Sequence, residues 1–327
     1  PPSINSYAYR SFDRQWILAD NRVADYLRPD LWLIHGDHQV YMASLFSQPL
    51  GHGPALTCSS VIPDLDHFRG SYGAKAAIPL YRSADKSDPN IVPGLVDLLG
   101  EFYGRQVTPE DLAAYLYGAV AHPAFTNRYA KEMESREVHV PLTKNSDLFE
   151  KVRERGAHLL WLHTYGERFV PEGKRRGSVP RGAARCTEAV PTEPSEYPED
   201  FEYLPESKSL RVGAGTFAPV SQEVFDFEVS GLKVVQSWLK YRMKQGAGKK
   251  SSPLDDIRPE RWTSQFTTEL LEMIWVLEAT VEGYPDQAAL LEAIVEGDCF
   301  ITQELPPVPD KLRKPPGPAS REKTLFD

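Results

Sequence analysis

Apolar and polar positions along the chain follow two patterns, which predict strands in some segments and helices in others. Short apolar runs bounded by Gly, Pro or Asp are typical of strands. Such runs occupy residues 31–42, 55–62, 76–81, 201–204, 210–213 and 224–229. Apolar residues that recur every three or four positions predict helices. This spacing occurs in residues 93–103, 109–121, 125–133, 146–165, 231–243, 263–281 and 284–295.

The order of these elements predicts an α+β fold with a helical hairpin near its C-terminus. Residues 166–200 show little periodicity and many Gly, Pro and charged residues, so we expect a long loop there. We expect a mixed α+β domain over residues 1–245, followed by a flexible basic linker. The helical hairpin over residues 254–305 is expected to pack on that domain. Residues 306–327 are rich in proline and are expected to form a disordered tail.

The composition is that of a soluble globular protein, with 41% hydrophobic and 25% charged residues in a chain of 327. No apolar run approaches the ~18 residues that a membrane span needs. The three cysteines, Cys58, Cys186 and Cys299, are odd in number and far apart, which excludes a disulfide framework and a Cys-rich zinc module. We therefore expect a cytoplasmic protein with no membrane partner. Because the chain starts without Met, we also expect it to be a piece of a larger protein.

The formal net charge of −9 at first disfavours a nucleic-acid-binding protein, which is usually basic. However, residues 269–304 contain nine acidic residues and no Lys or Arg, which accounts for the whole net charge. Residues 168–185 contain six basic residues and one acid, and residues 240–250 contain five basic residues and no acid. Binding depends on the local field, so these basic segments remain candidates for phosphate contact. We expect the acidic helices to face solvent or a protein partner.

Several enzymatic signatures do not occur in the chain: the phosphate-binding loop, the nucleophile elbow, H-E-x-x-H and a strand-linked G-x-G-x-x-G. The most enzyme-like feature is a set of histidines and aspartates: His35, Asp37, His38, His52, Asp64, Asp66 and His67. These residue types could bind a divalent metal. They are also ordinary turn residues that bond to the backbone. A metal-dependent hydrolase therefore remains one hypothesis.

Three groups of polar residues are candidates for contact with a nucleic acid. Residues 67–75 form a Gly/Ser-rich loop that carries Arg69, Ser71 and Lys75. The N-terminal arginines alternate with aspartates, and the segment 168–185 contains three consecutive cations. The complete candidate set is Arg10, Arg14, Arg69, Ser71, Lys75, Lys174, Arg175 and Arg176. Each group also has a plainer interpretation: a hairpin loop, a salt-bridged face and a solvated loop, respectively.

The segment Tyr9-Arg10-Ser11-Phe12-Asp13-Arg14 resembles a family motif. It is similar to the Y-R-P-F-D-x-R opening of the C-terminal target-recognition (specificity) domain of Type ISP restriction–modification enzymes, with Ser11 in place of the proline. Asp20-Asn21-Arg22 and Arg28-Pro29 follow, as they do in that family. Further similar segments follow in order to about residue 305. They begin with Ile62-Pro63-Asp64-Leu65 and end with the helix from Trp262-Thr263 to Ala279-Thr280.

The resemblance implies a function. Members of the family are single-chain bacterial proteins that join a nuclease, a helicase-like motor, an N6-adenine methyltransferase and a DNA-reading domain. The chain would thus recognise a sequence in double-stranded DNA and orient the methyltransferase and motor domains of the same full-length protein. The methyltransferase motif N-P-P-[YF] and its glycine loop do not occur here. We therefore expect no enzymatic activity and no cofactor for this chain alone. S-adenosylmethionine and ATP with Mg would belong to the N-terminal part.

The resemblance also suggests how the candidate residues would work. Arginine bound to guanine, or Asn or Gln bound to adenine, would read bases in the major groove, while Lys and Arg on loops would hold phosphates. An alternative remains open. In that alternative the chain is an interaction module that docks on the methyltransferase part through its acidic helices and contacts DNA little by itself.

Overall fold

The computed structural model describes residues 3–20, 22–24, 27–44, 51–68, 77–135, 138–244 and 259–312, and it confirms the α+β class. The strands are β1 (Ser3–Arg10), β2 (Asp13–Ala19), β3 (Tyr41–Ala43), β4 (Thr57–Ser59), β5 (Ala77–Pro79), β6 (Arg185–Glu188), β7 (Phe201–Leu204), β8 (Ser209–Val212), β9 (Gly215–Ala218), β10 (Glu228–Val229) and β11 (Leu232–Lys233). The α-helices are α1 (Pro29–Leu33), α2 (Leu95–Tyr103), α3 (Pro109–Val120), α4 (Pro123–Arg128), α5 (Ser146–His163), α6 (Gln222–Phe225), α7 (Val234–Lys240), α8 (Ser264–Glu282) and α9 (Tyr284–Glu296).

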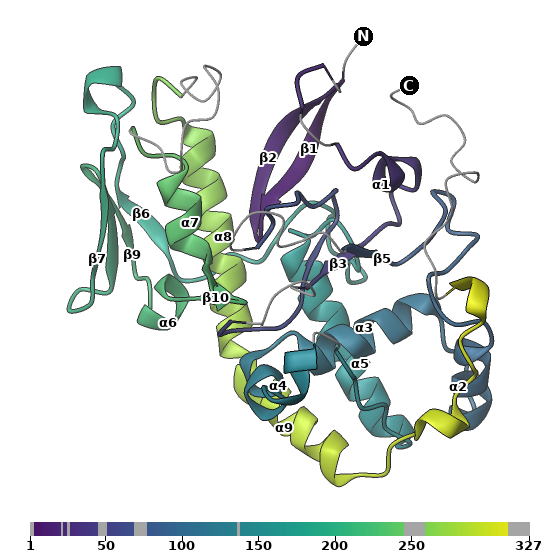
Figure 1. Ribbon diagram of the computed structural model, residues 1–327. Coiled ribbons are helices and arrows are strands. Elements are labelled where there is room, and N and C mark those ends of the chain that lie inside the picture. Colours follow the sequence, from purple (N-terminus) through teal and green to yellow (C-terminus); the bar gives the residue numbers. More distant parts are fainter. Residues whose placement is uncertain are drawn as a thin grey trace.

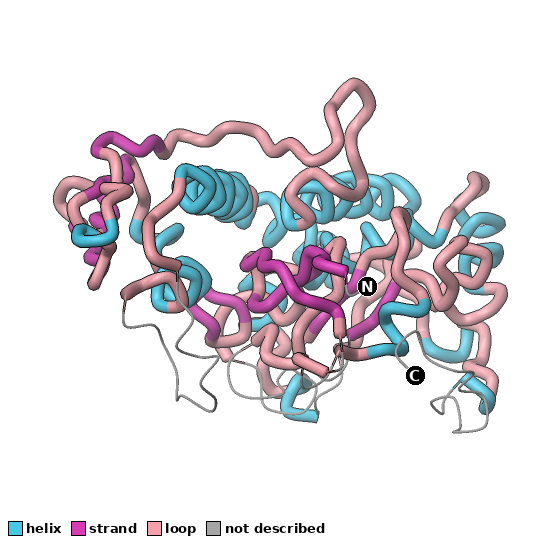
Figure 2. Tube along the Cα trace, turned by 90° about the horizontal axis from the view of Figure 1, so that it is seen from above, coloured by secondary structure: helices cyan, strands magenta, loops and turns pink. Residues whose placement is uncertain are grey.

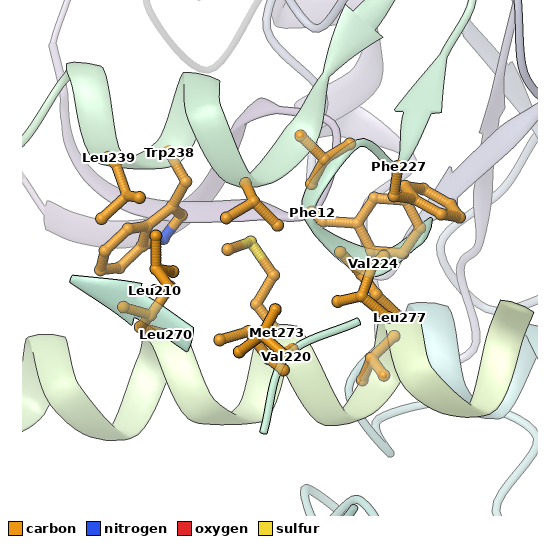
Figure 3. Close-up of a cluster of buried hydrophobic side chains, with 14 of the residues drawn as sticks. Phe12, Leu210, Val220, Val224, Phe227, Trp238, Leu239, Leu270, Met273 and Leu277 are labelled. Carbon is orange, nitrogen blue, oxygen red and sulfur yellow. The ribbon is translucent and has the colours of Figure 1, made fainter. Parts of the chain in front are cut away.

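A four-stranded antiparallel sheet and the helices α7 and α8 enclose one hydrophobic core. The sheet has the strand order β6-β9-β8-β7. Figure 1 shows it at one side of the molecule, with α7 and α8 beside it. Leu210 of β8, Trp238 of α7 and Leu270 of α8 are buried here. Figure 3 shows these side chains in the space between the two helices. This core fixes the outward face of α8, which borders the candidate interface.

Helices α2, α3, α4, α5 and α9 form a second core, together with a small sheet of strand order β4-β3-β5. The helices α3 and α5 cross at close range because Gly156 of α5 lies against the backbone of α3. A Cβ atom at Gly156 would lie 1.7 Å from the carbonyl oxygen of Ala114. Beside this crossing Tyr115 stacks on Phe149, with 4.7 Å between ring centroids. The close crossing fixes the C-terminal end of α5, from which the basic segment 168–185 continues.

The two expected C-terminal helices are present and follow one another through Gly283. Residues of α8 contribute to the sheet core, whereas Leu291 and Ile294 of α9 are buried in the helical core. Figure 1 shows α9 leading away from the end of α8 toward α4 and α5. These two consecutive helices therefore contribute to both cores.

An N-terminal hairpin of β1 and β2 is an element that the apolar pattern does not predict. The two strands pair antiparallel, from Ser3 opposite Ala19 to Arg10 opposite Asp13. Its turn residue Phe12 has a φ of 63° and packs into the sheet core, where its ring lies 5.7 Å from that of Phe227. Figure 3 shows these two rings together at one end of the core. The hairpin is thereby attached to the rest of the fold through its turn.

The strand prediction for 224–229 is only half right, because the short helix α6 precedes β10 there. Ser221 caps this helix by accepting a hydrogen bond from the backbone N–H of Val224 at 3.3 Å, and a local cap of this kind overrides the apolar pattern. The segment 31–42, predicted to be one strand, is mostly not a strand. It includes the end of helix α1 and only the start of β3.

The segment 166–200, which we expected to be a loop, contributes the strand β6 and a 3-10 turn at Pro194–Glu196. The strand β6 has no buried residue, so it lacks the alternation that would reveal it. The predicted linker after residue 244, the segment 69–76 and the tail beyond residue 312 lie outside the described residues. In the described part of the chain, no helix has the length and apolarity needed to cross a bilayer.

Candidate nucleic-acid interface

The segment Tyr9 to Arg14 lies at the turn of the N-terminal hairpin, and its charged side chains bind other parts of the chain. Arg10 donates to the backbone carbonyl oxygens of Asp66 and Phe68, and its Nη2 donates to the hydroxyl of Tyr241 at 3.0 Å. The guanidinium lies 5.1 Å from the centroid of the Tyr9 ring and 5.5 Å from that of Tyr241. Arg10 therefore connects three segments of the fold.

The side chain of Arg14 also contacts other segments of the fold. Its Nη2 donates to a carboxylate oxygen of Glu272 on α8 at 2.6 Å, and its guanidinium carbon lies 3.6 Å from the centroid of the Tyr165 ring. The Tyr165 hydroxyl donates to the carbonyl oxygen of Phe12 at 2.7 Å. The hairpin turn is thus held against the end of α5 and the outer side of α8. Two of the predicted DNA-contacting arginines have structural partners in the fold.

A cleft of about 310 Å³ opens beside this hairpin. Its walls come from the hairpin, from the residues after β4, from the C-terminal end of α5 and from the loop that follows α5. Three of the predicted site residues line it together: Arg10, Arg14 and Arg176. Arg168 and His67 line it as well. The fold therefore brings two N-terminal arginines and two arginines of residues 168–176 to one place, which their positions in the sequence do not reveal.

Two of the histidines proposed as metal ligands, His67 and His35, bind other groups of the fold. His67 is buried, and its Nδ1 lies 3.1 Å from the carbonyl oxygen of Ala8. Burial lowers the pKa of His67 to about 4, so the ring is neutral. The Nδ1 atom of His35 lies 3.0 Å from the hydroxyl of Tyr41. Among the described residues, no three His, Cys, Asp or Glu side chains are placed to hold a metal ion. The geometry here does not support the hydrolase hypothesis.

Residues 166–185, which run from the end of α5 to the first residue of β6, are called the basic loop below. Figure 2 shows it running along the outer side of the helices and projecting from the body at a turn. Lys174 and Arg175 are exposed at this turn, and neither forms an ion pair with a carboxylate in the described part of the chain. Arg176 is half-exposed and binds Asp37 and Glu167. The turn therefore presents two cations to solvent.

Arg168 anchors the start of the basic loop and is 8% exposed. Its Nε donates to the carbonyl oxygen of Gln39 at 2.9 Å, and its Nη2 donates to that of Gly36 at 3.2 Å. Burial lowers the pKa of this guanidinium. This buried guanidinium, bound mainly to carbonyl oxygens, ties the loop to residues 36–39. The exposed carboxylate of Asp37 in that segment then contacts Arg176 of the basic loop.

The other end of the basic loop is attached to α8. Glu278 accepts hydrogen bonds from the backbone N–H groups of Ala183 and Ala184 at 2.8 and 3.2 Å. The indole N–H of Trp275 donates to the carbonyl oxygen of Ala184 at 2.8 Å. The exposed Arg181 and Arg185 lie 6.0 and 5.9 Å from the Trp275 ring centroid, within the range of cation–π contact.

Sequence reasoning counted Arg181 and Arg185 in a basic segment but did not select them as site residues. The signal that separates them from other exposed cations is their aromatic platform, Trp275, which lies about ninety residues further along the chain. Three other candidates, Arg69, Ser71 and Lys75, lie outside the described residues.

The acidic residues of 269–304 are used inside the molecule more than we expected. Several of them bind cations of other segments or backbone N–H groups. These are Glu272 with Arg14, Glu278 with Ala183 and Ala184, Glu292 with Arg128, and Glu304 with Lys144. The acidic stretch therefore neutralises several cations of the body, whereas Lys174 and Arg175 of the basic loop have no carboxylate partner among the described residues.

Comparisons with known proteins give a family and a fold. The family model of the Type ISP C-terminal specificity domain matches residues 1–273. No curated protein sequence is significantly similar to the chain. The cryo-EM structure of a DrdV–DNA complex is similar with a TM-score of 0.63 and 16% identity, over 89% of this chain and 28% of that chain.

Two further solved structures have the same fold. One is a nuclease-deletion mutant of the Type ISP restriction-modification enzyme LlaGI in complex with a DNA substrate mimic, with a TM-score of 0.55 and 15% identity over 89% of this chain and 21% of that chain. The other is the ATP-dependent Type ISP restriction-modification enzyme LlaBIII bound to DNA, with a TM-score of 0.61 and 13% identity over 92% of this chain and 19% of that chain. The chain thus spans between 19% and 28% of the length of these proteins. The family match includes the N-terminal hairpin, the basic loop and half of α8, and on this match the chain belongs to the Type ISP C-terminal specificity domain family.

Proposed function

We propose that the chain recognises a sequence in double-stranded DNA and that its basic loop holds the phosphate backbone. The observation that carries this proposal is the set of four exposed cations on one loop that lack a carboxylate partner within the described residues: Lys174, Arg175, Arg181 and Arg185. Phosphate contacts by Lys and Arg fix the register of a protein on DNA, and contacts to base edges then read the sequence. Membership in a specificity-domain family supports a recognition role for the chain. In this proposal the catalytic role belongs to other domains of the full-length protein.

The cleft beside the hairpin is the second part of the proposed interface. Arg14 and Arg176 line it, and both are partly exposed. In this proposal residues 1–245 and the helices within 254–305 act together as the recognition unit. In the loop over residues 67–75, Arg69, Ser71 and Lys75 remain proposed contacts to DNA. The solved relatives, which are described as bound to DNA or to a DNA substrate mimic, support the choice of ligand.

The whole protein would be a cytoplasmic restriction–modification enzyme that methylates adenine. This chain would orient its methyltransferase and motor domains on the DNA. S-adenosylmethionine and ATP with Mg would bind to those other domains. The support for this larger proposal is the family match together with the length of the solved relatives, of which the chain spans the smaller part.

One observation favours a second function, docking on another part of the same protein. The outer face of the hairpin exposes apolar side chains, with Ile4 69% and Trp16 67% exposed. Ile4 lies opposite Leu18, so these side chains share one face of the hairpin. Exposed apolar surface of this kind is typical of protein contacts. The two functions are compatible, because this face and the basic loop involve different residues.

Selection from a pool of duplexes with a randomised segment tests DNA recognition directly. The isolated chain is expected to enrich one sequence, and its affinity for that sequence should exceed its affinity for unselected duplex by at least ~10³-fold at physiological salt. A matched control is the K131Q/K151Q variant, which loses two exposed lysines outside the basic loop and should select the same sequence. Failure to enrich any sequence at low salt would contradict the proposal and favour docking.

A further inference from the structure

The turn of the basic loop is closed by its own backbone. The N–H of Gly177 donates to the carbonyl oxygen of Gly166 at 2.9 Å, which brings the two ends of residues 166–177 together. At the tip, the N–H of Lys174 donates to the carbonyl oxygen of Pro171 at 3.0 Å. Gly166 has a φ of 78°, and a Cβ atom there would lie 2.4 Å from the carbonyl oxygen of Ser178. The close approach of the two ends of the turn therefore requires glycine at position 166. This closure determines where the tip projects.

The side chain of Arg176 joins this turn to the rest of the protein through two ion pairs. Its Nε donates to Oε2 of Glu167 at 2.8 Å, across the base of the turn. Its Nη2 donates to Oδ1 of Asp37 at 2.9 Å, on a segment 139 residues away in the sequence. Arg168, next to Glu167, bonds to the carbonyl oxygens of Gly36 and Gln39 and so holds the Asp37 segment in place. We call Glu167, Asp37 and Arg176 the clamp.

The clamp lies directly beside the two unpaired cations of the tip. Arg176 follows Lys174 and Arg175 in the chain, so fixing its side chain fixes the backbone from which they project. Lys174 and Arg175 themselves have no side-chain hydrogen bond within the described residues that would hold them. The order of the tip thus comes from the clamp, from the backbone closure and from the Ser178 hydroxyl, which donates to the carbonyl oxygen of Arg175 at 2.6 Å.

We propose that Glu167 and Asp37 are positioning residues, which hold Arg176 so that Lys174 and Arg175 are presented to the phosphates of DNA. This inference rests on the proposed function. It also changes the role of Arg176, which serves as a link between segments, while its two neighbours contact the ligand. Ordering the tip before binding lowers the entropy lost when the complex forms.

Neutralising Glu167 or Asp37 should change the affinity for DNA in the direction opposite to the one that electrostatics alone predicts. Two carboxylates near a phosphate-binding turn repel DNA, so their neutralisation should strengthen binding if charge alone mattered. If they position the turn, their neutralisation should weaken binding, since the tip then has to be ordered in the complex. The sign of the change therefore separates the two explanations.

The test compares E167Q, D37N and E172Q, with short duplex DNA as the probe at two salt concentrations. Glu172 is an exposed acid of the same loop and has no ion pair in the described part of the chain, so E172Q is the matched loss of one negative charge. E167Q and D37N are each expected to weaken binding about three- to tenfold. E172Q is expected to leave affinity unchanged or to increase it. Asp37 is 77% exposed at its side chain, so D37N keeps the test valid even where E167Q lowers stability.

A second background distinguishes positioning from a general structural defect. In the K174Q/R175Q variant the tip has no cations to present, so adding E167Q or D37N should change the remaining affinity less than twofold. Equal or tighter binding by E167Q and D37N in the wild-type background would overturn the inference, as would an undiminished weakening in the K174Q/R175Q background. Failure of the proposed function looks different: the wild-type chain would not bind the duplex, or K174Q/R175Q would bind it as the wild type does.

Discussion

Asp13 and Arg242, 229 residues apart in the sequence, form a buried bidentate ion pair between the turn of the N-terminal hairpin and the end of α7. Nη2 of Arg242 donates to Oδ1 of Asp13 at 2.8 Å, and Nη1 donates to Oδ2 at 3.2 Å. Both residues are at most 4% exposed. The guanidinium also lies 3.7 Å from the centroid of the Trp238 ring. This pair connects the family motif to the sheet core.

Removing the charge of Asp13 should destabilise the protein strongly. In D13N the Arg242 guanidinium stays buried, and its nearest remaining carboxylate is that of Glu269 at 3.8 Å. An uncompensated buried charge of this kind costs about 3–5 kcal/mol of unfolding free energy. Urea denaturation followed by tryptophan fluorescence measures the change. As a control, E272Q breaks the more exposed pair with Arg14 and should cost at most about 1 kcal/mol. Equal losses for the two variants would contradict the account.

Buried neutral histidines should make the fold sensitive to acid. His163 lies between α3 and α8: the Tyr117 hydroxyl is 2.6 Å from its Nδ1, and the Thr280 hydroxyl is 2.9 Å from its Nε2. The Thr280 hydroxyl donates to the carbonyl oxygen of Val276, so its oxygen accepts from the imidazole Nε2–H. The network therefore uses neutral imidazole. Burial lowers the pKa of His163 to about 3.

The folded-state pKa of His163 lies below the unfolded value of about 6.5, so the unfolded chain takes up the proton first as the pH falls. The stability from this group is complete above pH ~6.5 and decreases toward pH ~3. At pH 5 the loss should be about 2 kcal/mol relative to pH 8. Unfolding free energies of the wild type and H163Q at pH 8 and pH 5 measure it. H163Q should lose about 2 kcal/mol less than the wild type between these pH values; an equal loss would show that His163 is not the group responsible.

The platform at Trp275 should contribute phosphate contacts of its own. Replacing Arg181 and Arg185 with glutamine should lower the slope of log K against log salt by about 0.9 for each phosphate that is no longer neutralised. W275L keeps both charges but removes the ring beneath them, and it should weaken duplex binding about two- to fivefold. R211Q is the control, because Arg211 is paired with Asp200 and Glu202 on the sheet. If R181Q/R185Q bound the duplex with the affinity and salt slope of the wild type, the platform would have no part in binding.

The elements that depend on local signals could be predicted from the sequence. Thr108 caps α3 in a reciprocal capping box with Asp111, and both partners lie within one turn of the helix. The long helix α8 follows its apolar repeat from residue 264 to 282. Both signals are contained in a few neighbouring residues, so no tertiary contact is needed to see them.

The elements missed were those whose stability comes from distant partners. Strand β6 pairs with β9, about thirty residues later, and β6 has no apolar alternation of its own that marks it. The N-terminal hairpin exposes Ile4 and Trp16, so its strands lack a clear polar face and a clear apolar face. These strands form because they pair with other strands and pack on the rest of the fold. The local pattern of apolar and polar residues does not reveal these contacts.

The candidate site shows the same limit. Sequence reasoning found the cations of the basic loop, because they are consecutive. It could not tell which of them are neutralised, since Asp37, one of the two partners of Arg176, and Glu272, the partner of Arg14, are both far away in the chain. The placement of Arg10 and Arg14 in the fold gives them structural contacts, and the roles of all eight candidates in DNA binding remain predictions.

The salt dependence of duplex binding tests the central proposal most directly. The association constant of the wild-type chain and of K174Q/R175Q is measured for one selected duplex from 50 to 300 mM salt. The account predicts that the slope of log K against log salt is smaller in magnitude by about 1.8 for the variant, because it neutralises two fewer phosphates. It also predicts that K131Q/K151Q keeps the wild-type slope. Identical slopes for the wild type and K174Q/R175Q would contradict the assignment of the basic loop to the DNA backbone.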